Sequence, residues 1–163
     1  MSFGKKTERL SPAGSMESLK AAVNNGCDAV YLGGKAFSAR QYAGNFSLQE
    51  LEEACDYCHL RGVKVYVTVN TLYKEEELKG FLEFVSRLYE MGVDALIMQD
   101  AGAARLVREH FPDFPLHAST QMTANSLADV EYWAGQGFRK VVLSRELSLE
   151  EIQEITAHTD AEI

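Results

Sequence analysis

Residues 63–70, VKVYVTVN, decide between the two folds that the rest of the sequence allows. The valines occupy every second position, so in an extended strand they all lie on one face. Buried strands of an open, doubly wound sheet usually read as continuous apolar runs instead. A second face that carries lysine, tyrosine, threonine and asparagine is typical of a barrel strand that faces a lumen and leads into a site. The stretch therefore favours a parallel (β/α) barrel, similar to a TIM barrel.

The strand at 63–70 follows a glycine that ends a helical pattern, and this plan recurs along the chain. Residues 25–32 (NGCDAVYL), 91–98 (MGVDALIM) and 136–143 (QGFRKVVL) repeat it. A glycine fits the left-handed cap of a helix, and the β-branched residues after it favour a strand. S-x-x-E capping boxes at Ser47 and Ser148 mark two helix starts. Strict alternation of strands and helices predicts parallel strands joined by right-handed crossovers.

The chain is shorter than a complete barrel. A (β/α)8 barrel normally takes about 250 residues, whereas this chain has 163. The pattern predicts about six β/α units and the start of a seventh strand near Ala161, as one N-terminal portion of a barrel domain over residues 1–163. A doubly wound sheet is the alternative. Strands are expected near 8–11, 28–33, 63–70, 94–99, 115–119 and 139–144, and helices near 15–25, 47–61, 75–91, 101–111, 123–136 and 148–158.

Composition indicates a globular protein of the cytoplasm. The sequence is 46% hydrophobic and 25% charged, with a formal net charge of −8, so it has no chain-wide basic surface for nucleic acid. No apolar run approaches the ~20 residues of a membrane helix. The N-terminus has no apolar segment typical of a secretory signal. Three cysteines fit a reducing compartment better than a disulfide framework.

The predicted carboxyl ends of the strands are rich in small and polar residues, and in parallel α/β folds the site lies at these ends. Arg40 and Arg145 are candidates to bind a carboxylate or phosphate, because a guanidinium can bind either group with two hydrogen bonds. Asp100 and Glu146 are candidate bases, although a carboxylate at a helix start can instead stabilise the helix. Further candidate substrate-binding residues are Ser15, Asn70, Ser119, Thr120 and Gln121.

Two motifs suggest chemistry that their context does not support. Cys55 and Cys58 form a C-x-x-C-H run, as in haem attachment, but both lie on the apolar stripe of a predicted helix, which favours buried thiols. His117 and Ser119 share one face of a predicted strand, and Asp100 could orient the histidine. No strained nucleophile elbow such as G-x-S-x-G accompanies them, so a catalytic triad is disfavoured. No metal site is predicted.

The chain resembles the collagenase-like peptidase family U32 from about Leu10 to its last residue. The resemblance is carried by LSPAGSMESLKAA, GCDAVYLGGKAFSAR, NFSLQELEEA, VYVTVNTL, GVDALIMQD, HASTQMTAN and VVLSRELSLEEI, in this order. It implies a TIM-like barrel and places the family's signature positions on Ser11–Ser15, Arg40, Asn45, Phe46, Ser119–Gln121, Arg145 and Glu146. Ser11 replaces the alanine usual in the first of these motifs.

The resemblance implies more than one activity. Some members are labelled proteases or collagenases, and others hydroxylate RNA or the ubiquinone ring without oxygen, with prephenate as oxygen source and an iron-sulfur cluster. The cluster cysteines follow strand seven, and Cys27, Cys55 and Cys58 do not match them. We therefore expect the N-terminal barrel region of an RNA hydroxylase that binds a small anion such as prephenate and is inactive by itself. A collagenase-like protease is the first alternative. The second is a non-enzymatic module that self-associates through open barrel edges.

Overall fold

The computed structural model describes residues 7–39 and 44–163. Its strands form one parallel sheet in the order β1-β2-β3-β4-β5-β6. A doubly wound sheet would reverse its strand order at a switch point, so this sequential order identifies the barrel type. The strands are β1 (Leu10–Pro12), β2 (Ala29–Gly33), β3 (Lys64–Val69), β4 (Ala95–Met98), β5 (Leu116–Ala118) and β6 (Lys140–Val141).

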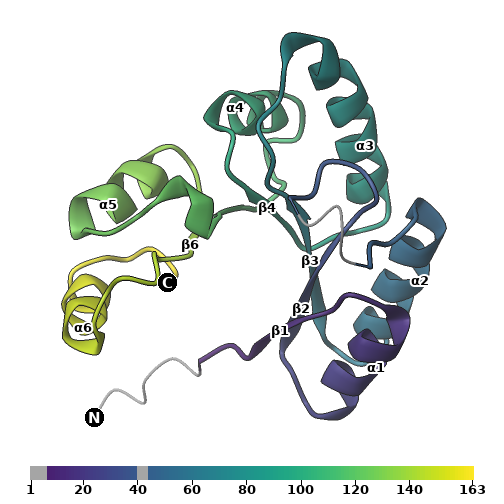
Figure 1. Ribbon diagram of the computed structural model, residues 1–163, viewed down its shortest axis with the longest axis horizontal. Coiled ribbons are helices and arrows are strands. Elements are labelled where there is room, and N and C mark those ends of the chain that lie inside the picture. Colours follow the sequence, from purple (N-terminus) through teal and green to yellow (C-terminus); the bar gives the residue numbers. More distant parts are fainter. Residues whose placement is uncertain (1–6, 40–43) are drawn as a thin grey trace.

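The sheet curls into an incomplete barrel with the helices on its outer side (Figure 1). The predicted seventh strand begins as expected, because Glu162 pairs in parallel with Lys140 of β6. No helix of the described residues is long and apolar enough to cross a membrane. The α-helices are α1 (Met16–Asn24), α2 (Leu48–His59), α3 (Leu78–Glu90), α4 (Ala101–His110), α5 (Leu127–Gly135) and α6 (Leu149–Ala157). Two 3-10 helices are η1 (Glu75–Glu77) and η2 (Thr120–Met122).

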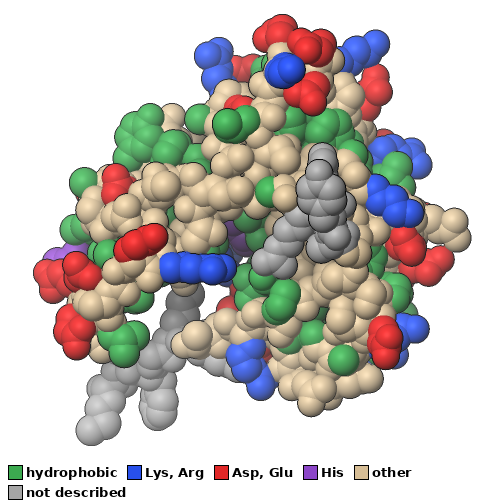
Figure 2. All heavy atoms as spheres, in the orientation of Figure 1, with side chains coloured by type: hydrophobic (Ala, Val, Ile, Leu, Met, Phe, Trp, Pro, Cys, Tyr) green, Lys and Arg blue, Asp and Glu red, His purple; other side chains and the backbone are tan. Residues whose placement is uncertain are grey.

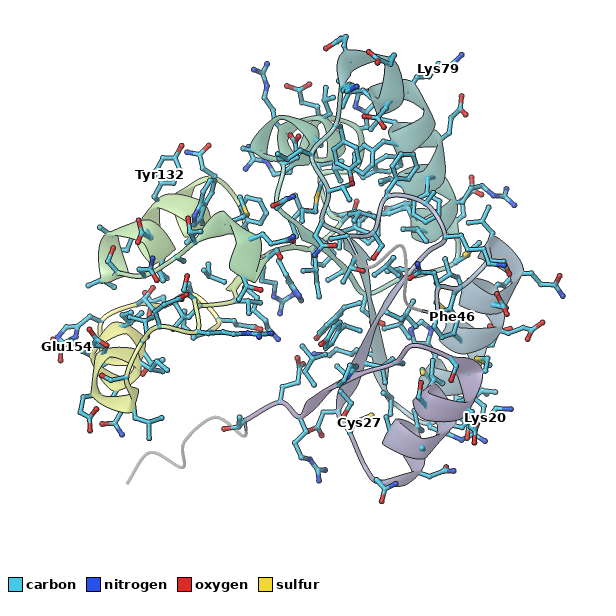
Figure 3. The ribbon with its side chains drawn as sticks, viewed as in Figure 1. Lys20, Cys27, Phe46, Lys79, Tyr132 and Glu154 are labelled. Atoms are coloured by element: carbon cyan, nitrogen blue, oxygen red, sulfur yellow. The ribbon has the colours of Figure 1, made fainter. Side chains whose placement is uncertain are left out.

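The two faces of β3 enter different clusters, as the alternating sequence predicts. The four valines at 63, 65, 67 and 69 are buried among the helices. Tyr66, on the other face, packs with Ala29, Ala95, Ile97 and Tyr31 inside the curl. Burying each valine is worth about 1.5–3 kcal/mol, so the outer layer holds the curved sheet together. Figure 3 shows Phe46 directed to the space between the sheet and α2, while Lys20, Lys79 and Glu154 point outward.

Helix ends follow the predicted signals except in one place. The Ser47 hydroxyl accepts from the Glu50 amide at 3.3 Å, and Glu50 Oε2 accepts from the Ser47 amide at 2.7 Å. Gly62 takes a φ of 69° at the end of α2. The helix predicted over 123–136 is wrong at its start: it begins only at Leu127. Thr123 has a φ of 54°, a left-handed conformation that cannot continue a helix.

Charged side chains fill the amino-terminal end of the lumen. Glu8 accepts from Lys140 Nζ at 2.6 Å, from Lys64 Nζ at 3.1 Å and from the Tyr66 hydroxyl at 2.9 Å. Burial alone would raise the pKa of Glu8, but these hydrogen bonds outweigh it and lower that pKa to about 2. The contacts join the segment before β1 to β3 and β6 across the lumen. Paired charges among the described residues therefore occupy this end of the lumen.

Candidate functional site

A cavity of about 300 Å³ opens at the carboxyl ends of the strands. Leucine, isoleucine, valine and tyrosine side chains form one part of its wall, and hydroxyl, amide and guanidinium groups form another. In Figure 2 the molecule is hollowed between the part that carries α5 and α6 and the part that carries β1–β3. The lining residues are Leu10, Tyr31, Thr68, Asn70, Ile97, Ser119, Thr120, Val142, Leu143 and Arg145.

A second cavity of about 310 Å³ lies beside the first, outside the ends of β5 and β6. It is lined by residues that each carry a polar group: Thr120, Gln121, Thr123, Asn125, Ser144, Arg145 and Glu146. Thr120 and Arg145 line both cavities. We call the first the inner cavity and the second the outer cavity. Two small groups could therefore bind side by side, with Arg145 at the junction.

Arg145 is the cation of this junction. Its side chain is exposed, and within residues 7–39 and 44–163 no carboxylate forms an ion pair with it. A guanidinium without a protein partner, at the edge of a partly apolar cavity, can bind a carboxylate or phosphate with two hydrogen bonds. The structure thus places Arg145 where the sequence predicts it and makes an anionic ligand chemically suitable.

Three predicted binding residues form one hydrogen-bond network. Asn70 Nδ2 donates to Gln121 Oε1 at 2.7 Å, and the Ser119 hydroxyl donates to the same oxygen at 3.2 Å. The Ala39 amide in turn donates to Asn70 Oδ1 at 3.2 Å. Asn70 follows β3, whereas Ser119 and Gln121 follow β5, so the network spans β4 and brings together groups that are 51 residues apart.

The connection after β2 packs onto the end of β3. Ser38 is buried, and its hydroxyl lies 3.1 Å from that of Thr68. A Cβ on Gly33 would lie 2.5 Å from Ser38 Oγ and 3.0 Å from Asn45 Oδ1, so glycine permits this close approach. The predicted residue Asn45 therefore lies beside the end of β2. Arg40, a predicted anion-binding residue, lies outside the described residues.

Asp100 and Ser15 occupy structural positions as helix caps. One oxygen of Asp100 accepts from the Ala103 amide at 2.9 Å, which caps α4, and the other accepts from the Tyr73 amide at 3.1 Å. Ser15 caps α1 through a capping box with Ser18. Neither residue lines the inner or the outer cavity. Of the two predicted catalytic carboxylates, only Glu146 borders one, on the outer side.

His117 and Ser119 lie on one face, as alternation predicts, but they do not form a catalytic pair. Ser119 Oγ donates to Gln121, and the His117 ring meets the Tyr66 ring edge-on at 4.6 Å between centroids. No hydrogen bond joins the two in the described part of the chain. Burial, with the positive charge of Lys140 nearby, lowers the pKa of His117 to about 4. His117 is thus a neutral side chain packed in the lumen.

The cysteines of this chain do not fit an iron-sulfur cluster. Cys27, Cys55 and Cys58 are buried free thiols, and in the described ranges no three His, Cys, Asp or Glu side chains gather in a way that could hold a metal ion. Burial raises the pKa of Cys55 to about 12 and that of Cys58 to about 11. Cluster ligands must be thiolates. The expectation that Cys55 and Cys58 are core residues is confirmed.

Several site residues were not predicted from the sequence. Tyr31, Thr68, Ile97 and Val142 line the inner cavity. For Tyr31, Thr68 and Ile97 the signal was present in the alternation of β2, β3 and β4, which directs every second side chain into the lumen. Ser38 and Ala39 carried no such signal, because their position depends on how the long connection after β2 packs onto β3.

The fold and these cavities define a (β/α)-barrel protein whose candidate ligand site lies where that fold class carries it, at the carboxyl ends of the strands. Residues 14–163 match Peptidase family U32, and the chain belongs to this family.

Relatives and a solved structure agree with this assignment. The chain is 45% identical to the tRNA hydroxylation protein P of Escherichia coli (strain K12), over 92% of this chain and 33% of that protein. It is 40% identical to the 23S rRNA 5-hydroxycytidine C2501 synthase of the same strain, over 97% of this chain and 24% of that protein. The U32 peptidase Mk0906 has the same fold, with a TM-score of 0.75 at 16% identity, over 99% of this chain and 68% of that one. The chain thus spans a third or less of these two relatives.

Proposed function

We propose that this chain is the substrate-binding barrel region of an enzyme that hydroxylates RNA without molecular oxygen and takes the oxygen atom from prephenate. The observation that carries the proposal is the pair of adjoining cavities with Arg145 at their junction. Such an arrangement suits two reactants that must meet. Two relatives, a tRNA hydroxylation protein and a 5-hydroxycytidine synthase, support RNA as one of them.

The residues of the inner cavity bind the small molecule, and those of the outer cavity bind the nucleotide. Arg145 pairs with a carboxylate of the small molecule, and the apolar wall around Ile97 and Leu143 takes its ring. Ser119 and Thr120 supply hydroxyl groups at the same place. The outer cavity, polar and bordered by Glu146, receives the nucleotide, and Glu146 is the candidate proton acceptor. The chain's own cysteines do not fit the iron-sulfur cluster that the resemblance implies, so no step here depends on that group.

RNA binding needs positive charge that this chain does not supply overall. Its formal net charge is −8, and affinity for RNA depends on neutralising phosphates with lysine and arginine. We therefore expect the chain by itself to bind RNA weakly and to be inactive, and we expect the complete enzyme to work in the cytoplasm. The remaining two thirds of protein P and three quarters of the synthase lie outside the match.

Mass spectrometry of nucleosides tests the proposal. In a strain that lacks the gene, a hydroxylated nucleoside should disappear from tRNA or rRNA. The wild-type gene should restore it, and a gene with Arg145→Ala should not. Wild-type levels of every hydroxylated nucleoside in the deletion strain would refute the proposal. Incubation of the complete protein with casein or collagen tests the protease alternative, which the separate contacts of His117 and Ser119 disfavour.

A second candidate is assembly through the sheet edges. β1 and β6 are the edge strands, and only Glu162 pairs with β6 on its outer side in the described part of the chain. Free backbone groups at such edges can pair with another copy. Gel filtration with light scattering distinguishes a homodimer, which this candidate requires, from a monomer, which would exclude it.

A further inference from the structure

The hydrogen bonds around Asn70 have a direction that is fixed by the backbone. The Ala39 amide donates to one end of the Asn70 side chain at 3.2 Å. A peptide N–H can only donate, so that end must be the oxygen and the opposite end the NH2 group. The NH2 group then faces Gln121 at 2.7 Å, and the Gln121 atom there must be its oxygen. The usual ambiguity of amide orientation is thereby removed for both residues.

The consequence is a free donor in the outer cavity, which Arg145 also lines. The Gln121 oxygen accepts from Asn70 and from Ser119, so both of its lone pairs are used. Its NH2 group has no acceptor in the described ranges of the chain. Gln121 is exposed and lines the outer cavity together with Arg145.

We infer that Gln121 Nε2 donates a hydrogen bond to the carboxylate that Arg145 binds, and that Asn70 is the positioning residue that fixes this donor. The inference rests on the proposed function, since it takes a small carboxylate as the ligand. It also predicts a specificity: the ligand atom next to Gln121 Nε2 must be a hydrogen-bond acceptor such as an oxygen, and a ligand N–H group in that place would be repelled. If Gln121 turned over, its NH2 group would face that of Asn70 at 2.7 Å, which is repulsive.

Asn70→Asp reverses the donor without changing the size of the side chain. Aspartate still accepts from Ala39, but its second oxygen cannot donate to Gln121. Gln121 must then turn its NH2 group toward residue 70 and present its oxygen to the ligand. The added negative charge would also weaken anion binding without any such turn. Asn125→Asp is the matched control, because it adds the same charge beside the outer cavity but outside these hydrogen bonds.

Binding of phenylpyruvate, a stable carboxylate with a ring, measures the coupling by calorimetry on the 163-residue chain. Gln121→Ala should weaken binding about tenfold or more, as expected for a lost hydrogen bond to a charged group. Asn70→Asp should weaken it by more than Asn125→Asp does. In the Asn70→Asp background, Gln121→Ala should cost nothing further. Full additivity of the two substitutions would overturn the inference.

Side-chain amide resonances provide a readout that does not depend on the ligand. In the free wild-type chain, the Asn70 NH2 protons should exchange slowly and those of Gln121 rapidly. Phenylpyruvate should then shift and protect the Gln121 pair. Protection of the Gln121 NH2 group in the free chain would overturn the inference. So would a wild-type chain that does not bind phenylpyruvate, but RNA hydroxylation would still stand on the nucleoside measurement.

Discussion

The two ends of the lumen are built from similar residue types and used in opposite ways. At the amino-terminal end, Glu8 meets Lys64, Lys140 and Tyr66, and its carboxylate is fully engaged. At the carboxyl end, Arg145 has no ion pair in the described part of the chain. Buried charge that is paired contributes to specifying the fold, whereas charge left unpaired at the rim is available to a ligand.

Lys140→Met should destabilise the fold most. Methionine keeps the apolar length of the side chain, which is only 11% exposed, but it removes the closest partner of Glu8. Breaking a buried ion pair typically costs about 3 kcal/mol, because the remaining charge stays buried. The free energy of unfolding in urea measures the loss. Arg105→Met, which breaks an exposed pair with Glu109, is the control and should leave that free energy unchanged within error. Equal losses of unfolding free energy in the two variants would contradict the distinction between a buried and an exposed ion pair.

Acid should destabilise the amino-terminal end in two pH ranges. His117 has its pKa lowered by burial to about 4 from 6.5, so the stability it contributes is present above pH 6.5 and is lost as pH falls to 4. Glu8 has a pKa lowered to about 2 from 4.5, so its contribution is lost as pH falls from 4.5 to 2.

Urea unfolding at intervals between pH 7 and pH 2 measures these two ranges. His117→Phe should remove the upper pH dependence, worth about 3 kcal/mol, and leave the lower one. Glu8→Gln should reduce the lower pH dependence, to which the lowered pKa values of Glu50, Asp129 and Glu151 also contribute, and leave the upper one. A pH dependence that both variants leave unchanged would mean that neither group titrates as its surroundings indicate.

Variants of Asp100 distinguish a structural role of its carboxylate from a catalytic one. Asp100→Ala should cost about 1 kcal/mol, the usual value of an N-cap. Asp100→Ser keeps a capping oxygen and should recover most of that stability. If the carboxylate only caps α4, the serine variant should also support RNA hydroxylation in the deletion strain. Loss of hydroxylation in a variant of near-normal stability would instead establish the catalytic role that the sequence allowed.

The fold was predictable because its signals are local. Alternation in β3, the glycine before each strand and the capping serines each follow from residues within one turn or one strand. The path of residues 37–39 was not predictable. Phe37 takes a φ of 65°, unusual for an aromatic residue, and its ring packs 5.6–5.8 Å from those of Tyr73, Phe81 and Phe84. Such contacts depend on residues more than 30 positions away.

The site was predictable to the extent that it lies at strand ends. Ser119 directly follows β5, Gln121 lies in η2 just after it, and Arg145 lies in the connection after β6; all three line a cavity. Asp100 also follows a strand, but a carboxylate before a helix can cap it or face a ligand, and only the tertiary contact with Tyr73 shows which oxygens are occupied. The donor direction of Gln121 required the Ala39 amide, which no local pattern reveals.

Arg145→Ala should have the smallest effect on the fold and a large one on binding. Its side chain is exposed and has no protein partner in the described ranges, so truncation should change the free energy of unfolding by less than about 0.5 kcal/mol. Phenylpyruvate binding should weaken at least about tenfold, because a charge-assisted pair of hydrogen bonds is lost. Arg105→Ala, on the outer surface of α4, is the control for net charge and should alter neither quantity. The opposite result would be a destabilised Arg145→Ala chain that still binds phenylpyruvate. Arg145 would then stabilise the barrel, and the carboxyl end of the lumen would have to bind its ligand without it.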